Sequence, residues 1–139
     1  MIKGVDHIGI AVHSIDQALP FYMESLKCKW MGEEVVEAQK VKVVFLDAGN
    51  IKFELLEPTS ESSPVVTFLQ KRGEGIHHIA IKVEDIQSRI DEIKEKGIEM
   101  IDHSPRVGAK GANIAFMHPK STRGVLFELC EKKEDSHNG

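Results

Sequence analysis

Two histidines and two glutamates occupy equivalent positions in the two halves of this chain. The aligned segments are Gly4–Val12 with Gly75–Val83, and Ile51–Glu57 with Val125–Glu131. Neither alignment needs a gap, and they place His78 on His7 and Glu128 on Glu54. Imidazole nitrogens and carboxylate oxygens together suit a borderline divalent cation, with one or two positions left for water or a substrate oxygen. The four residues therefore form a candidate metal site.

All four segments are predicted to be β-strands, in which successive side chains point to opposite faces of the sheet. His7 then shares a face with Gly9 and Ala11, whereas Ile8 and Ile10 point the other way. The other three segments show the same division into a bulky apolar face and a sparser face that carries one His or one Glu. We expect helices on the apolar face and a ligand on the sparser face.

A plainer reading of the same residues is two core histidines and two exposed glutamates. A single histidine on an apolar strand would indicate little, but this reading does not explain why all four residues lie opposite the bulky face. Recurrence at repeat-equivalent positions favours the metal site. His77 adjoins His78 but should point to the opposite face, which predicts a structural role for it.

The repeat predicts an α+β fold in which each copy runs β-α-β-β-β. We expect one domain over residues 1–139, with module one at about 1–58, a linking helix at about 63–73, module two at about 75–131 and a polar tail at 132–139. In module one, Ser14 or Asp16 is the predicted N-cap of a helix that closes at 27–30, and Pro20 suggests a ragged start. In module two, a helix over about 85–96 precedes a strand at Ile98–Ile101.

Composition narrows the function classes. Apolar residues make up 41% of the chain, and the formal net charge of −4 argues against nucleic-acid binding driven by phosphate neutralisation. No apolar run approaches the roughly 20 residues that a membrane span needs, and no signal-peptide pattern is present. Cys28 and Cys130 are interpreted as reduced thiols, so we expect a cytoplasmic protein.

The motifs resemble those of the vicinal oxygen chelate superfamily, which includes the glyoxalases, and within it the methylmalonyl-CoA epimerase family. The segments that carry the resemblance are Val5–Val12, Glu54–Pro58, Gly75–Ala80, Met117–Lys120 and Gly124–Leu129. Together they extend over nearly the whole chain up to about Glu131. The adjacent histidines and the His-Pro-Lys-Ser run are the more specific signals.

The resemblance implies two tandem βαβββ modules that form a curved, partly open mixed sheet with helices on its outer face. It also implies an isomerase that interconverts the C2 epimers of methylmalonyl-CoA by proton transfer through a metal-stabilised enolate. A divalent metal ion (cobalt, zinc, nickel or manganese), an acyl-CoA substrate and a homodimer would follow.

Single residues carry over as follows. His7, Glu54, His78 and Glu128 match the metal positions, although some members have Gln at the position of Glu54. Glu128 also matches a residue proposed as one acid/base, and Glu54 is the candidate for the other. In some members the opposing base is a Glu near the position of Val43.

Three alternatives stay open within the superfamily. A glyoxalase I (lactoylglutathione lyase) would use a similar His/Glu set on a glutathione adduct. A ring-cleaving dioxygenase would use two His and one carboxylate on iron, and would consume oxygen. A metal-free binding protein would hold no cation, which the ligand set disfavours.

Overall fold

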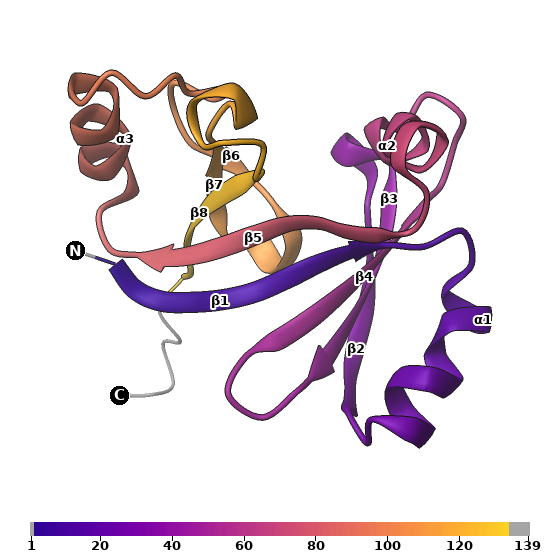
Figure 1. The fold of residues 1–139 in the computed structure, drawn as a ribbon. Helices are drawn as coiled ribbons and strands as arrows, with labels where there is room; N and C mark the ends of the chain where they lie inside the picture. Colours follow the sequence, from indigo (N-terminus) through magenta and orange to yellow (C-terminus); the bar gives the residue numbers. More distant parts are fainter. Residues whose placement is uncertain (1, 134–139) are drawn as a thin grey trace. The chain divides into compact units, whose positions relative to one another are not determined.

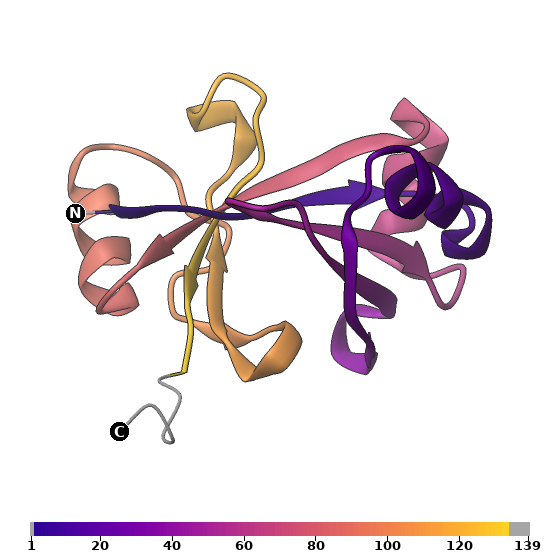
Figure 2. The ribbon, with the colours of Figure 1, turned by 90° about the horizontal axis from the view of Figure 1, so that it is seen from below.

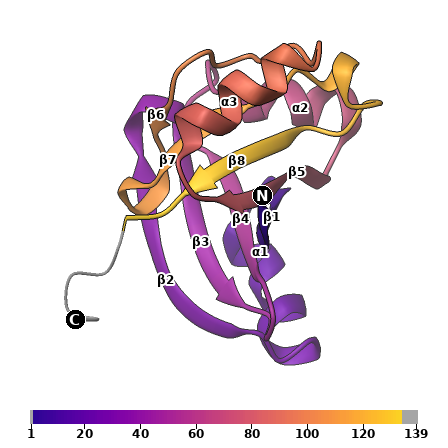
Figure 3. The same cartoon turned by 90° about the vertical axis from the view of Figure 1, so that its left-hand side faces the viewer.

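The first βαβββ copy places its histidine strand beside its glutamate strand. The computed structural model describes residues 2–133. The elements of this copy are β1 (Ile2–Ala11), α1 (Ile15–Pro20), a π-helical turn (Phe21–Ser25), β2 (Lys29–Val36), a 3-10 turn (Glu37–Gln39), β3 (Val41–Asp47) and β4 (Lys52–Pro58). The strand order is β2-β3-β4-β1, in which β2, β3 and β4 are antiparallel and β4 runs parallel to β1. Figure 3 shows β2 and β3 curving side by side.

The second copy follows after the linking helix α2 (Pro64–Arg72). Its elements are β5 (Gly75–Val83), α3 (Ile86–Glu95), β6 (Arg106–Val107), a 3-10 turn (Ala109–Gly111), β7 (Asn113–Phe116), a second 3-10 turn (Pro119–Ser121) and β8 (Phe127–Glu131). Their order, β5-β8-β7-β6, repeats that of the first copy, with β5 and β8 parallel and the rest antiparallel. In Figure 2 the yellow β8 runs beside the orange β7. The predicted α+β class and the β-α-β-β-β order are confirmed.

Strand register is also repeated. Gly9 of β1 lies opposite Glu54 of β4, and Ala80 of β5 lies opposite Glu128 of β8. In each copy the residue two places after the histidine therefore pairs with the glutamate. Because residues two apart on a strand share a face, the histidine and the glutamate of one copy point to the same side.

Contacts divide the chain into two compact units that differ from the two sequence copies. The central unit is His7–His78, and the flanking unit joins Met1–Asp6 to Ile79–Gly139. β1 and β5 therefore each contribute residues to both units. The expected tail at 132–139 extends beyond the described residues at its last six positions. The single-domain division made from the sequence stays a prediction.

Each unit has its own apolar core on the bulky face of its strands. In the central unit the buried members are Val12, Ile15, Cys28, Val44, Leu46 and Leu55, with Ala18 and Leu19 of α1 packed against them. In the flanking unit they are Val83, Ile86, Ile90, Met100, Ala115 and Leu129, with Ile93 of α3. Figure 1 shows α1, which supplies Ile15, Ala18 and Leu19, and α3, which supplies Ile86, Ile90 and Ile93. The expected packing of helices against the apolar face is confirmed.

The helix of module one begins at the predicted N-cap Ser14 but ends earlier than predicted. It begins cleanly at Ile15, because the Ser14 side chain accepts a hydrogen bond from the Gln17 amide. Pro20 is the last residue of α1, and the chain continues as a π-helical turn in which Leu26 N–H donates to the Phe21 carbonyl at 3.0 Å. Proline lacks an amide hydrogen, which favours a change of winding at this point. Lys29 and Trp30 belong to β2 rather than to the end of the helix.

A further prediction about module two was wrong. Ile98–Ile101 does not form a strand, since only Met100 makes an isolated bridge, to Met117. The third-from-last strand of this copy is instead the short β6, which lies five residues beyond the end of the predicted strand. Of the apolar residues that suggested a strand, Met100 belongs to the core and is 2% exposed, whereas Ile101 is 48% exposed.

Candidate metal centre

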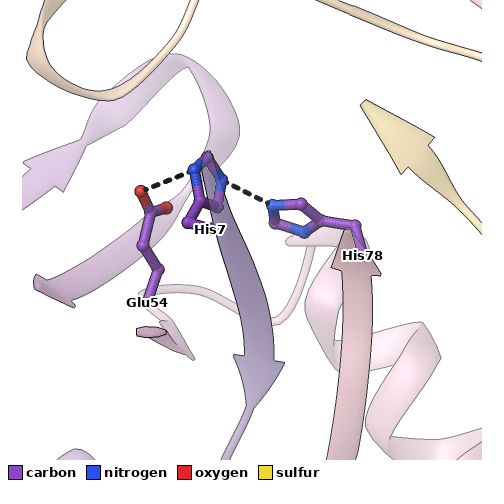
Figure 4. A group of neighbouring side chains, drawn as sticks. All are labelled: His7, Glu54 and His78. Carbon is purple, nitrogen blue, oxygen red and sulfur yellow. Dashed lines mark hydrogen bonds and ion pairs between the residues drawn. The ribbon is translucent and has the colours of Figure 1, made fainter. Parts of the chain in front are cut away.

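Three of the four predicted ligands come together inside the central unit. His7 lies on β1, Glu54 on β4 and His78 on β5, and these residues are only 5%, 7% and 6% exposed. Figure 4 shows the His7 ring between the other two side chains. Buried polar groups are costly unless they are paired or bind a ligand, so the contacts of these three side chains decide what the cluster can do.

The contacts within the cluster run through His7. Its Nδ1 lies 3.3 Å from Oε2 of Glu54, and its Nε2 lies 3.2 Å from Nε2 of His78. The two imidazole rings meet edge to face, with centroids 5.2 Å apart. One ligand atom from each residue falls within 4.8 Å of the others.

Gly9 makes room for this arrangement. The ring of His78 lies so close to Gly9 that an added Cβ would come within 2.8 Å of Nε2, and closer still to Nδ1 and Cε1. Contacts below 3.0 Å are essentially never seen for real Cβ atoms. A glycine is therefore needed here for close approach of the ring to the backbone, and its own dihedral angles are not the reason.

His77 contacts the cluster from outside. Its Nδ1 lies 2.9 Å from Nδ1 of His78, and its ring meets the Phe68 ring of α2 edge to face at 5.0 Å. Burial lowers the pKa of His77 to about 4. Burial, followed by the neighbouring His7 and His77, holds the pKa of His78 well below its usual 6.5. His78 is therefore neutral at pH 7, the form in which imidazole binds a metal.

The donor set fits a divalent cation. Nitrogen and oxygen ligands lie about 2.0–2.2 Å from zinc, which places two adjacent ligand atoms roughly 3–3.5 Å apart. The 3.2 Å between the two Nε2 atoms matches that spacing. Two neutral imidazoles facing one another can make at most one hydrogen bond, whereas both lone pairs can bind one ion. The residues His7, Glu54 and His78 could thus hold a metal.

Glu128, the fourth predicted ligand, lies in the flanking unit. It is buried on β8, 5% exposed, and pairs with Ala80 of β5 and Phe116 of β7. Glu54 has the equivalent cross-strand neighbours, Gly9 and Phe45. The place of Glu128 in the ligand set stays a prediction.

Comparison with known proteins gives the family. The glyoxalase/bleomycin resistance protein/dioxygenase superfamily matches residues 6–116. The chain belongs to this superfamily. The match includes the histidines and glutamate of the cluster, and within the superfamily the chain is similar to enzymes of the isomerase class.

Two relatives and one solved structure illustrate these similarities. An uncharacterized Bacillus subtilis protein, YqjC, is 47% identical over 134 residues, which are 96% of each chain. The ethylmalonyl-CoA/methylmalonyl-CoA epimerase of Cereibacter sphaeroides is 37% identical over 93% of this chain and 98% of its own length. A Streptomyces coelicolor methylmalonyl-CoA epimerase variant in complex with 2-nitronate-propionyl-CoA is 38% identical with a TM-score of 0.90, and the alignment covers 96% of this chain and all of that one.

Sequence reasoning missed two contributors to the candidate site. His77 was expected to play a structural role on the opposite face, yet its Nδ1 contacts His78. Strand alternation predicts only the direction in which a side chain leaves the backbone. The Nδ1 atoms of His77 and His78 lie close to the backbone, so they can meet although the two side chains leave the strand on opposite faces. Gly9 was recognised only as a small residue on the sparser face. The equivalent residue in the second copy is Ala80, which is also small. The sequence therefore did not indicate that the first copy needs a glycine to accommodate the His78 ring.

Val43 is buried on β3, 2% exposed, opposite Leu56 of β4 and Glu34 of β2. Because a valine stands here, this position supplies no carboxylate for proton transfer, as the sequence indicated.

None of the described helices has the length and apolar character needed to span a bilayer.

Proposed function

We propose that this chain is a metal-dependent epimerase that interconverts the C2 epimers of methylmalonyl-CoA. The observation that carries the proposal is the buried cluster of His7, Glu54 and His78 in a chain similar to methylmalonyl-CoA epimerases over more than nine-tenths of its length. That one similar structure contains a propionyl-CoA analogue supports an acyl-CoA substrate.

We also propose Glu128 as the fourth ligand. Its support is the repeated register, in which Ala80 faces Glu128 as Gly9 faces Glu54. In the first copy, β1 and β4 supply one His and one Glu to the metal site. By the same register, β5 and β8 of the second copy would supply His78 and Glu128. The family resemblance further supports a homodimer, which sedimentation would test.

The reaction requires the loss of a weakly acidic proton. Carbon C2 carries both the thioester and the carboxylate. When the C2–H bond breaks, the electron pair of that bond delocalises onto the thioester oxygen. A bound divalent cation would supply the positive charge that stabilises this oxygen. The chain's own residues must then take the proton on one face of C2 and return a proton on the other.

Two carboxylates are assigned to proton transfer. Glu128 would accept the C2 proton through a carboxylate oxygen, and Glu54, starting as the protonated carboxyl group, would be the donor on the opposite face, because the position of Val43 offers no acid or base. The burial of both carboxylates excludes bulk water from the proton being moved. In the reverse direction the same two groups exchange roles.

Exchange in deuterated water tests the proposal. Purified protein loaded with cobalt should epimerise methylmalonyl-CoA and place deuterium at C2, as measured by mass spectrometry and proton NMR. Ethylmalonyl-CoA and the methylglyoxal–glutathione hemithioacetal serve as comparison substrates. Turnover of the hemithioacetal without C2 exchange would replace the proposal by a lactoylglutathione lyase, and oxygen uptake would indicate a dioxygenase.

Substitution of Glu128 tests its role separately. Glu128→Gln keeps an oxygen ligand but cannot carry the proton, so kcat should fall by about 10²–10⁴-fold with bound metal retained. Glu61→Gln, at an exposed glutamate, is the matched control. Full turnover by Glu128→Gln with metal bound would remove Glu128 from the proton path.

A further inference from the structure

His77 has no part in the proposed reaction, yet it is built into the surroundings of the cluster. Its ring lies between the Phe68 ring of α2 and the ring of His78, with Nδ1 2.9 Å from Nδ1 of His78. Adjacent residues on a strand normally diverge, so an Nδ1–Nδ1 contact needs particular side-chain torsions for both rings. The edge-to-face contact with Phe68 helps to hold the His77 ring in that orientation.

Counting hydrogens shows what the contact does. A neutral imidazole carries one N–H and one lone pair, so fixing either nitrogen fixes the other. If the Nε2 lone pair of His78 binds a cation, the hydrogen of His78 must be on Nδ1. That N–H is buried and needs an acceptor, and Nδ1 of His77 lies at hydrogen-bond distance.

We propose that His77 is a positioning residue that accepts the Nδ1–H of His78 and thereby keeps the Nε2 lone pair of His78 available to the cation. This role rests on the proposed metal centre. It assigns His77 the task that a carboxylate or backbone carbonyl performs behind most metal-binding histidines.

The same contact has a different proton arrangement when no cation is bound. His77 Nδ1–H can then donate to His78, His78 Nε2–H to His7, and His7 Nδ1–H to Glu54, along the contacts of 2.9, 3.2 and 3.3 Å. All three hydrogens point the same way along this chain of contacts, so both nitrogens of His7, both nitrogens of His78 and Nδ1 of His77 each have a partner. Cation binding must reverse the His77–His78 hydrogen bond, and an imidazole at position 77 can both donate and accept.

Cation affinity tests the role without reference to turnover. His77→Asn retains an acceptor oxygen near the place of Nδ1, whereas His77→Leu has a similar size and no acceptor. Zinc affinity, measured by competition with a chromophoric chelator, should fall about 10–100-fold in His77→Leu. His77→Asn should stay within about threefold of the wild type, as a rescue by the conservative variant. His13→Leu, at an exposed histidine of the same unit, is the matched control.

Nitrogen NMR of histidine-labelled protein observes the tautomers directly. In the zinc-loaded wild type, His78 should carry its hydrogen on Nδ1, and in the chelator-treated protein on Nε2. Zinc-loaded His77→Asn should keep the hydrogen on Nδ1. A urea unfolding curve for each variant separates a loss of affinity from a loss of folding.

Two results would overturn the role. One is wild-type zinc affinity in folded His77→Leu, and the other is a hydrogen on Nε2 of His78 in the zinc-loaded protein. If zinc binding survives His78→Ala unchanged, the ligand set itself is wrong and His77 loses its role with it. Normal zinc binding and tautomers without epimerase activity would overturn only the proposed function.

Discussion

Gly9 shows how much one missing methyl group can matter at a buried site. The ring of His78 occupies the space that a side chain at this position would fill. Gly9→Ala should displace the ring, cost about 1–3 kcal/mol of unfolding free energy and weaken zinc binding by more than tenfold. Urea unfolding and chelator competition measure the two effects.

The cause can be isolated with a double mutant. In a His78→Ala background the ring is gone, so Gly9→Ala should cost almost no stability there. An equal cost in both backgrounds would show that the strand, rather than the ring, demands the glycine.

Acid should destabilise the metal-free protein through its buried histidines. Burial lowers the pKa of His77 to about 4 and that of His78 well below 6.5, so the folded state binds these protons less readily than the unfolded state. The contribution of both groups is complete above pH 6.5, and that of His77 is lost as the pH falls toward 4. Each group removes up to about 1.4 kcal/mol per pH unit in that window. Urea titrations in chelator should show a shallower pH slope for His77→Asn, and an unchanged slope would contradict the lowered pKa.

At the scale of elements, both copies use a glutamate to start their helix. Oε1 of Glu57 accepts a hydrogen bond from the Ile15 amide at 2.7 Å, and Oε2 of Glu131 accepts one from the Ile86 amide at 3.4 Å. Each glutamate lies three residues after the site glutamate on the same strand, and so points to the opposite face. One strand therefore serves the site with one carboxylate and orients the neighbouring helix with another.

Removing these carboxylates should have unequal effects. Glu57→Ala should cost about 1–2 kcal/mol of unfolding free energy, because it leaves a helix-start amide without its charged acceptor. Glu131→Ala should cost less, since the hydrogen bonds that Glu131 accepts from the Ile86 amide and from Nδ2 of Asn113 are both long, at 3.4 and 3.3 Å. Glu61→Ala, an exposed change, is the control. Urea midpoints decide the ranking, and an equal loss in all three variants would contradict it.

The sequence predicted the parts of this protein that depend on strand alternation and the internal repeat. His7, Glu54 and His78 were found because both copies place them opposite a bulky face. The π-helical turn after Pro20 and the short β6 were not found, because apolar spacing records which side chains are buried and not how the backbone winds. The contact of His77 with His78 was also missed, since it depends on side-chain torsions that no spacing encodes.

At the scale of the whole molecule, the two sequence copies are not the two compact units. Residues 2–6 join the flanking unit, where Lys3 pairs with Glu84 and Asp6 pairs with Lys132 at 2.8 Å. A fragment that begins at Gly75 would lack these partners. Each compact unit therefore needs residues from both sequence copies, which β1 and β5 provide.

Separated fragments should be unable to fold. We expect a 75–139 fragment to give the circular dichroism of an unfolded chain, and to gain structure when mixed with a 1–74 fragment. Adding back a peptide of residues 1–12 alone should give at most partial recovery. A cooperative thermal transition for the 75–139 fragment by itself would show that the second copy is autonomous.

The two imidazoles that meet in the cluster are 71 residues apart along the chain. An ion held by both would act as a reversible cross-link that ties off nearly the entire central unit as a loop. Closing a loop of this length removes much of the freedom of the unfolded chain, and the gain grows with ion concentration by mass action. The same ion that would make the C2 proton of the substrate more acidic would then also raise the midpoint temperature of thermal unfolding.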